Sequence, residues 1–190
     1  MVNHFESILA GHVEAFQKTF VAAQLEVLDK VTRAVIQALK GGHKVLLCGN
    51  GGSATDALHI AAEFVGRFQK ERVSLPAIAL TADVAALTAI GNDYGYDRVF
   101  ERQVEGLGQK GDILIALSTS GKSPNVLKAI EKAKAQGILT VGFTGKDGGV
   151  LKGMVDICFL AKSDKTTYIQ ETHMAALHSI CEVVEKILFE

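Results

Sequence analysis

The sequence has no tryptophan, only two prolines and only three cysteines among its 190 residues. The cysteines, Cys48, Cys158 and Cys181, are widely spaced and cannot all pair within one chain, so we interpret them as buried apolar side chains in a reducing compartment. An excess of one charge is also missing, because 20 lysines and arginines stand against 21 aspartates and glutamates. Nucleic acids and anionic membranes bind basic surfaces, so neither is expected as a partner.

Long hydrophobic runs are absent as well. The most apolar window, residues 77–91, is interrupted by Asp83 and is shorter than the roughly 20 residues that a membrane span needs. The N-terminus lacks the basic start and apolar run of a signal peptide. We therefore expect a cytoplasmic protein. No proline-rich linker is present and the length suits one domain, so a single domain over residues 1–190 is predicted.

Apolar residues (48%) and glycines (19 residues) are abundant. Residues 1–40 carry apolar side chains at three- and four-residue steps, which predicts a helical N-terminal region. This region has more hydrophobic surface than one face of a sheet needs, which favours contacts between subunits.

From residue 41 to residue 190, short apolar runs alternate with helical patterns. The predicted strands are Lys44–Cys48, Ala77–Leu80, Asp112–Leu117, Leu139–Thr144 and Val155–Leu160. Strands that alternate with helices and are apolar throughout are typical of a parallel sheet covered on both faces. The fold class is therefore predicted as α/β, with a doubly wound, flavodoxin-like parallel sheet of five strands and extra N-terminal helices.

Two of the predicted strands end in loops rich in glycine and hydroxyl groups, each directly before a helix. Glycine allows backbone N–H groups to approach an anion, and a helix N-terminus adds free donors and partial positive charge. Serines that cap the helices would explain one such loop, but the hydroxyl groups exceed what capping needs. They belong to Ser53, Ser118, Thr119, Ser120 and Ser123. The pattern favours a site for phosphate or a phosphosugar, although neither loop completes a dinucleotide-binding or P-loop motif.

Asp56, His59 and Glu63 are predicted to share a stripe of the helix after the first loop, because steps of three and seven residues return to nearly the same face. Gln170 and His178 share a face of the last helix, so His59, Glu63, Gln170 and His178 converge if the two helices pack. These groups suit Zn²⁺ binding, and they also suit proton transfer. The alternative is that the histidines are ordinary core or interface side chains.

Asn92 and Asp93 follow an apolar helical pattern and are predicted to form a polar turn. Two interpretations remain for this pair. One is an Asx-type turn without further function, and the other is a contact with sugar hydroxyl groups.

Five motifs together resemble the phosphoheptose isomerases of the sugar-isomerase (SIS) superfamily. They are CGNGGS at 48–53, GNDYG at 91–95, STSGKS at 118–123, TGKDGG at 144–149 and IQE at 169–171. The resemblance implies the SIS fold and an aldose–ketose isomerase that converts sedoheptulose 7-phosphate to D-glycero-D-manno-heptose 7-phosphate through an enediol. That reaction is the first step of ADP- or GDP-heptose and lipopolysaccharide biosynthesis. The family is also tetrameric, with active sites at subunit interfaces.

The resemblance assigns roles to individual residues. It implies that Glu63 is the catalytic base, that His178 is the catalytic acid, and that one zinc ion per subunit is bound by His59, Glu63, Gln170 and His178. The implied substrate contacts are Asn50, Gly51, Gly52, Ser53, Asp56, Glu63, Asn92, Asp93, Ser118, Thr119, Ser120, Ser123 and Gln170. Metal binding and acid–base chemistry compete for the same lone pairs, and the sequence leaves both open.

Two alternatives concern function. Some SIS proteins are non-catalytic modules that bind a phosphosugar or a protein, such as the DnaA-binding initiation factor, and these lack the glutamate and the final histidine. The present chain has both Glu63 and His178, which favours an enzyme. It departs from the family at residues 166–168, where Thr-Thr-Tyr replaces a segment that often ends in arginine. The outer substrate contacts, and with them the identity of the sugar phosphate, therefore stay open.

Overall fold

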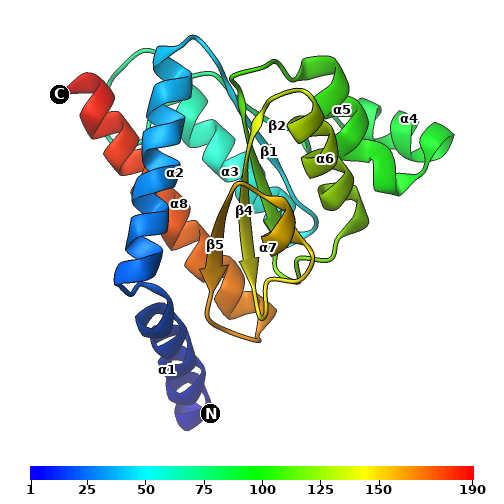
Figure 1. Cartoon of the computed structure of the whole chain (residues 1–190). Helices are drawn as coiled ribbons and strands as arrows, with labels where there is room; N and C mark the ends of the chain where they lie inside the picture. Colours follow the sequence, from blue (N-terminus) through cyan, green and yellow to red (C-terminus); the bar gives the residue numbers. More distant parts are fainter.

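The computed structural model describes all of residues 1–190 and has a sheet between two layers of helices (Figure 1). Its helices are α1 (Val2–Thr19), α2 (Ala22–Lys40), α3 (Gly52–Val65), α4 (Val84–Tyr94), α5 (Val99–Leu107), α6 (Pro124–Ala135), α7 (Leu151–Met154) and α8 (Thr166–Phe189). Its strands are β1 (Val45–Cys48), β2 (Ala77–Ala79), β3 (Ile113–Ser118), β4 (Leu139–Gly145) and β5 (Ile157–Ala161). A short 3₁₀ turn, Tyr96–Arg98, joins α4 to α5.

All five strands are parallel and lie in the order β2-β1-β3-β4-β5. This is the flavodoxin-like order, so the predicted α/β fold class is confirmed, and each predicted strand lies within two residues of an observed one. Every residue of β1 and β3 is buried, because helices cover both faces. The strand order reverses at β1 and β3, which brings the loops after these two strands together at the carboxyl edge.

Alternate residues of β1 and β3 enter two separate cores. Val45 and Leu47 of β1 belong to a cluster with α2, α3 and α8, whereas Leu46 and Cys48 belong to a cluster with α5 and α6. The fold therefore places α3 and α8 on the same face of the sheet, and these helices carry the predicted charged groups.

Burial of the cysteines is confirmed for two of the three. Cys48 and Cys181 are buried, and this burial raises the pKa of both thiols to about 12, which leaves them unreactive. Cys158 is only half-buried, contrary to the prediction, because it lies on β5 at the edge of the sheet. All three are free thiols.

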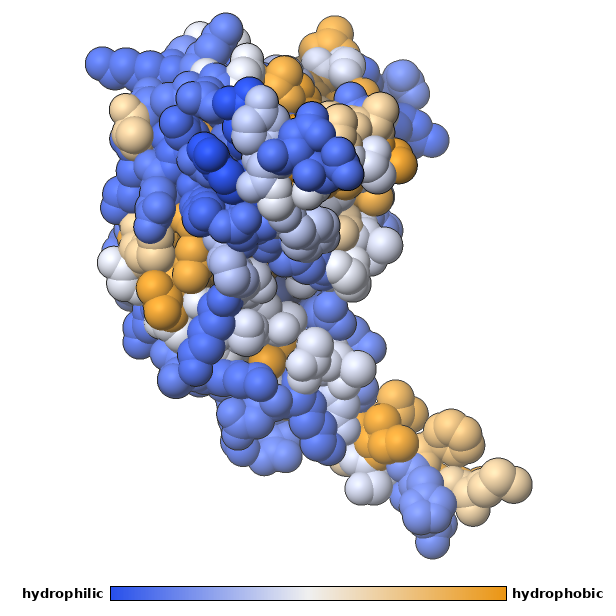
Figure 2. Space-filling model, turned by 90° about the vertical axis from the view of Figure 1, so that its right-hand side faces the viewer, coloured by the Kyte–Doolittle hydropathy of each residue, from blue (hydrophilic) through white to orange (hydrophobic).

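The N-terminal helical region divides into two helices after Thr19. The hydroxyl of Thr19 donates to the carbonyl oxygen of Ala15 (2.7 Å) and accepts from the N–H of Lys162 (2.8 Å), which fixes the end of α1 near β5. The first half of α1 extends beyond the sheet, and its apolar side chains stand exposed at the tip of the molecule (Figures 1 and 2). They are Val2, Phe5, Ile8 and Leu9, and the neighbouring Met1 and Val13 are exposed as well. No helix is both long and apolar enough to cross a membrane.

One predicted helix is shorter in the structure. The helical pattern after the first loop extends to Phe68, but α3 ends at Val65. Gly66 follows directly, and the guanidinium of Arg72 binds the carbonyl oxygens of Glu63 and Phe64 at the end of the helix. The periodicity of the sequence could not predict this end of the helix, because Arg72 lies in the chain beyond it.

The predicted polar turn at Asn92 and Asp93 is wrong. Both residues lie in the last turn of α4, which begins after the capping carboxylate of Asp83 and ends only where Gly95 adopts φ +89°. Helix formation therefore continues through the polar pair, and the chain turns after it.

Asp112 fastens the amino edge of the sheet. Its carboxylate is 1% exposed, accepts hydrogen bonds from the N–H groups of Lys44 (3.0 Å) and Gln109 (2.8 Å), and lies 2.6 Å from the Lys44 ammonium. Burial raises the pKa of this carboxyl, but these hydrogen bonds outweigh burial and hold the pKa below its ordinary value. The stabilisation is therefore complete above the ordinary pKa and is lost as the pH falls through the lowered value.

We expect Asp112→Asn to lower the free energy of unfolding by about 3 kcal/mol at pH 7, because it leaves a buried ionic contact without its anion. Urea unfolding at pH 7 and at pH 3 measures this, and the difference from the wild type should shrink at the lower pH. The control Asp29→Asn breaks an exposed pair with Arg33 and should cost less than about 1 kcal/mol. Equal losses in both variants would contradict the role given to Asp112.

Candidate active site

A pocket of about 330 Å³ lies where the loops after β1 and β3 meet. It is lined by Asn50, Gly51, Gly52, Ser53, Leu117, Ser118, Thr119, Ser123, Thr166 and Gln170. All of these except Leu117 and Thr166 are predicted substrate contacts, so the fold collects in one place residues that are far apart in the sequence. A larger groove of about 650 Å³ between α2 and α8 contains none of the predicted site residues.

Three helices begin at this pocket. Gly52 is the first residue of α3, Ser123 directly precedes α6, and Thr166 is the first residue of α8. The N–H groups of a first helical turn have no partner within the helix, and the aligned peptide dipoles make this end partly positive. No lysine or arginine lines the pocket. The arrangement can therefore bind an anion through backbone donors and hydroxyl groups.

Glycine and serine together shape the loop after β3. Gly121 has φ +63°, and a β-carbon there would collide with the backbone of the 144–149 loop, so only glycine fits. The hydroxyls of Ser118 and Ser123 are hydrogen-bonded across the loop at 3.0 Å. The TGKDGG motif thus supports the hydroxyl-rich loop from behind.

Asn125, which the sequence analysis missed, joins the two pocket loops. Its side-chain amide exchanges two hydrogen bonds of 2.8 Å with that of Asn50, and the hydroxyl of Tyr96 donates to the same Asn50 oxygen at 3.2 Å. These bonds leave one side-chain N–H of Asn50 for a ligand. An asparagine at a helix start is ordinarily interpreted as a cap, so the sequence held no signal for this long-range pair.

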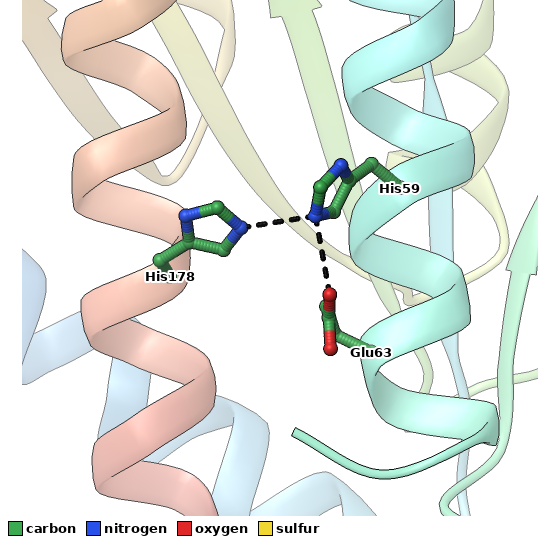
Figure 3. Close-up of side chains that lie close together, drawn as sticks. All are labelled: His59, Glu63 and His178. Atoms are coloured by element: carbon green, nitrogen blue, oxygen red, sulfur yellow. Dashed lines mark hydrogen bonds and ion pairs between the residues drawn. The ribbon is translucent and has the colours of Figure 1, made fainter. Parts of the chain in front are cut away.

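His59, Glu63 and His178 form a second cluster between α3 and α8 (Figure 3). Nε2 of His59 lies 3.1 Å from a carboxylate oxygen of Glu63 and 3.1 Å from Nε2 of His178. The ligand atoms of the three residues all lie within 4.8 Å of one another. Gln170 precedes His178 by about 12 Å along the axis of α8, and its amide lies against Gly52 in the pocket.

Burial and charge tune the groups of this cluster. Burial and the neighbouring His59 lower the pKa of His178, and Glu63 opposes them. Burial raises the pKa of the nearby Asp56 to about 6, against the influence of His59, and Oδ2 of Asp56 has no hydrogen-bond partner. The cluster thus combines two imidazole groups and a carboxylate, with a carboxyl of raised pKa nearby, which is a set suited to moving protons.

Besides Asp56 and Glu63, three predicted substrate contacts do not line the pocket. Ser120 lies in the loop after β3, but its hydroxyl accepts a hydrogen bond from the N–H of Lys122 at 3.3 Å. Asn92 and Asp93 are exposed on α4, and the amide of Asn92 donates to the carboxylate of Asp93 at 2.8 Å. Within this chain these residues stand apart from the pocket.

The unusual segment at residues 166–168 has two structural roles. Thr166 lines the pocket, whereas Tyr168 is 7% exposed and its hydroxyl donates to the carbonyl oxygen of Ile8 at 3.2 Å. Tyr168 also contacts the ring of His12, whose Nδ1 lies 2.5 Å from the carboxylate of Glu171. Tyr168 and Glu171 therefore anchor α1 to α8 in this chain.

Comparison with known proteins identifies relatives along the whole chain. The family model for the SIS domain matches residues 10–145. A protein of Bradyrhizobium sp. (strain ORS 278) named phosphoheptose isomerase is 49% identical, over 100% of this chain and 98% of that protein. A protein of the same name from a Nitratiruptor species is 52% identical, over 98% and 99% of the two chains.

Solved structures give the same relationship. The phosphoheptose isomerase GmhA from Neisseria gonorrhoeae superimposes with a TM-score of 0.92 at 38% identity, over 97% of this chain and 98% of the other. A phosphoheptose isomerase from Francisella tularensis superimposes with a TM-score of 0.94 at 37% identity, with the same coverage.

A substitution at Gly52 tests the pocket geometry. A β-carbon at this position would overlap the side-chain amide of Gln170, whereas alanine is at least as stable as glycine in a helix. We expect Gly52→Ala to keep the free energy of unfolding but to weaken binding of a sugar phosphate roughly tenfold, the equivalent of one lost hydrogen bond. Titration calorimetry measures the affinity.

The control for this experiment is Gly106→Ala in α5, where an added β-carbon meets no atom within 4 Å. This variant should bind as the wild type does. Unchanged affinity in Gly52→Ala would show that Gln170 and Gly52 do not shape the binding site.

Proposed function

This chain belongs to the SIS domain family and, within it, to the phosphoheptose isomerases, and we propose that it converts sedoheptulose 7-phosphate to D-glycero-D-manno-heptose 7-phosphate. The observation that carries the proposal is that α3 begins at the anion pocket and carries His59 and Glu63 of the cluster further along its length. Ser53 and His59 are about 9 Å apart along the axis of α3. This separation suits a substrate whose phosphate and reacting carbonyl group lie at opposite ends of a carbon chain.

The phosphate would bind in the pocket made by the loops at 49–53 and 118–123. Backbone N–H groups at the helix starts and the hydroxyls of Ser53, Ser118, Thr119 and Ser123 supply the donors. Asn50 adds its remaining side-chain N–H. We keep Ser120, Asp56, Asn92 and Asp93 as proposed substrate contacts from the family resemblance, although none of these four lines the pocket of the single chain.

The isomerisation moves a proton between C1 and C2 of the sugar through an enediol. In our proposal the Glu63 carboxylate removes the proton from carbon, and the His178 imidazole exchanges protons with the two oxygen atoms. The lowered pKa of His178 favours its neutral form, which has one nitrogen that donates and one that accepts. His59 contacts both groups and orients them.

The cluster also fits a zinc ion. Two imidazole nitrogens and one carboxylate oxygen that converge within 4.8 Å match the ligands that Zn²⁺ prefers. We propose that His59, Glu63 and His178 hold one zinc ion per subunit. Gln170, which the family resemblance implies as a fourth ligand, lies in the phosphate pocket about 12 Å along α8 from His178, so within the single chain it does not join these three. When bound, the metal would polarise the substrate carbonyl group.

We further propose a homotetramer with active sites at subunit interfaces, as the family resemblance implies. The exposed apolar side chains in the first half of α1 support this, because they have no partner within the chain. In this proposal residues 1–190 form one SIS domain, in which residues 1–40 contact other subunits and residues 41–190 form the catalytic core. The enzyme would act in the cytoplasm and supply heptose for lipopolysaccharide.

A non-catalytic SIS module that binds a phosphosugar or a protein is the competing function. Such a module needs the pocket but not the cluster. The contact of His59 with both Glu63 and His178 is therefore the feature that favours the enzyme over the module.

We expect Glu63→Gln to lower kcat at least about 100-fold, because the amide cannot accept the proton from carbon. Binding of sedoheptulose 7-phosphate and the free energy of unfolding should stay unchanged, because Glu63 lies outside the phosphate pocket. A coupled isomerase assay and calorimetry measure these quantities. Glu131→Gln, an exposed glutamate on α6, is the control. Turnover retained in Glu63→Gln would end the assignment of this residue as the base.

Metal dependence separates the two roles of the cluster. We expect isomerase activity to fall after treatment with a chelator and to return with one equivalent of zinc per subunit. Elemental analysis verifies the removal. Full turnover by the metal-free enzyme would assign His59, Glu63 and His178 to acid–base chemistry alone, and no turnover under any metal condition would favour the non-catalytic module.

A further inference from the structure

Arg72 and Glu185 form an ion pair beyond the C-terminal end of α3. Their side chains are 2% and 3% exposed, and Nε of Arg72 lies 3.0 Å from a carboxylate oxygen of Glu185. Removing two charges from water is costly, so a pair this deeply buried must be compensated by further hydrogen bonds. Neither residue lines the pocket or belongs to the predicted site.

Arg72 binds the end of the helix that carries Glu63. Its Nη2 donates to the carbonyl oxygen of Glu63 itself (2.7 Å), and its Nη1 donates to those of Phe64 (2.9 Å), Gly66 (3.3 Å) and Val73 (3.0 Å). The last carbonyl groups of a helix have no partner within it, and the guanidinium supplies one. The backbone from which the Glu63 side chain projects is thereby fixed.

Glu185 fixes the chain segment that packs against His178. It lies two turns after His178 on α8, and its carboxylate accepts hydrogen bonds from the N–H groups of Phe68 (3.1 Å), Gln69 (2.8 Å) and Lys70 (2.7 Å). The ring of Phe68 stacks on His178, with centroids 5.7 Å apart and planes inclined by 29°. Burial raises the pKa of the Glu185 carboxyl, but these hydrogen bonds and Arg72 outweigh it and lower the pKa, so Glu185 is charged at neutral pH.

We propose that Arg72 and Glu185 are positioning residues, which together set the separation and orientation of Glu63 and His178. Arg72 holds the backbone of Glu63, and Glu185 holds Phe68 against the His178 ring. The ion pair joins these two contacts directly, so it fixes the end of α3 and the backbone of Phe68 relative to each other. The catalytic part of this inference rests on the proposed isomerase function.

The first test compares two variants with a matched control. The double variant Arg72→Met/Glu185→Leu removes both charges, so no buried charge is left unpaired, and Glu185→Gln removes one. The control Glu182→Gln breaks an exposed ion pair with Lys186 (2.8 Å) on the same helix. Rates are measured at a temperature at which circular dichroism shows each protein to be folded.

We expect kcat to fall at least tenfold in the double variant and in Glu185→Gln, with KM within threefold of the wild type. The phosphate pocket lies at the other end of α3 and keeps its contacts, which is the reason for an unchanged KM. The control should keep both constants. A kcat within threefold of the wild type in the folded variants would overturn the positioning role, and so would variants that do not fold at all, because the pair would then serve stability alone.

A second measurement does not depend on activity. In NMR spectra of ring-labelled histidine at fixed pH, stacking on Phe68 shifts the ring protons of His178, whose signals are assigned with His178→Gln. These signals should move in the two variants and stay in place in Glu182→Gln. Signals unmoved in all variants would refute the inference. Moved signals together with a wild type that does not isomerise the sugar would uphold the positioning role and refute the proposed function instead.

Discussion

The packing of α3 on α8 is the contact on which both the anion pocket and the His59–Glu63–His178 cluster depend. The two helices run in the same direction, since each follows a parallel strand and both cover the same face of the sheet. Polar side chains of α8 contact α3 or the chain after it at three levels, each about two turns from the next: Gln170 at the pocket, His178 at the cluster and Glu185 beyond the end of α3. A sliding movement of one helix along the other would disturb all three levels together.

The sequence contained enough information for the sheet and for the pocket. The strands are apolar throughout because helices cover both of their faces, and this pattern needs no knowledge of the partner elements. The pocket loops could be predicted for a similar reason, since glycine and serine directly before a helix indicate an anion-binding loop without knowledge of distant residues. Asn92 and Asp93 show the limit of such local patterns. A polar pair between two glycines is compatible both with the predicted turn and with the last helical turn that it forms in the structure.

Contacts between distant side chains were beyond sequence reasoning. Arg72 and Glu185 are charged residues near element ends, where a charge is normally solvated, and only the packed fold reveals that both are buried. Histidines illustrate the same difficulty. His173 is fully buried, and burial lowers its pKa to about 4 against a hydrogen bond to Thr144, whereas His178, five residues later, reaches His59. Residue type and spacing could not separate a core histidine from one in the candidate cluster.

The three helix N-termini at the pocket have a consequence for what the pocket selects. Peptide dipoles do not titrate, so their attraction for an anion is the same at every pH at which the protein is folded. Only the charge of the bound anion changes with pH. The field also fades within a turn of the helix, unlike that of a lysine patch, which gathers polyanions from solution. The pocket therefore attracts only an anion that is small enough to reach the helix N-termini directly. Discrimination of this kind is part of the architecture, because the dipoles belong to the backbone and not to any side chain.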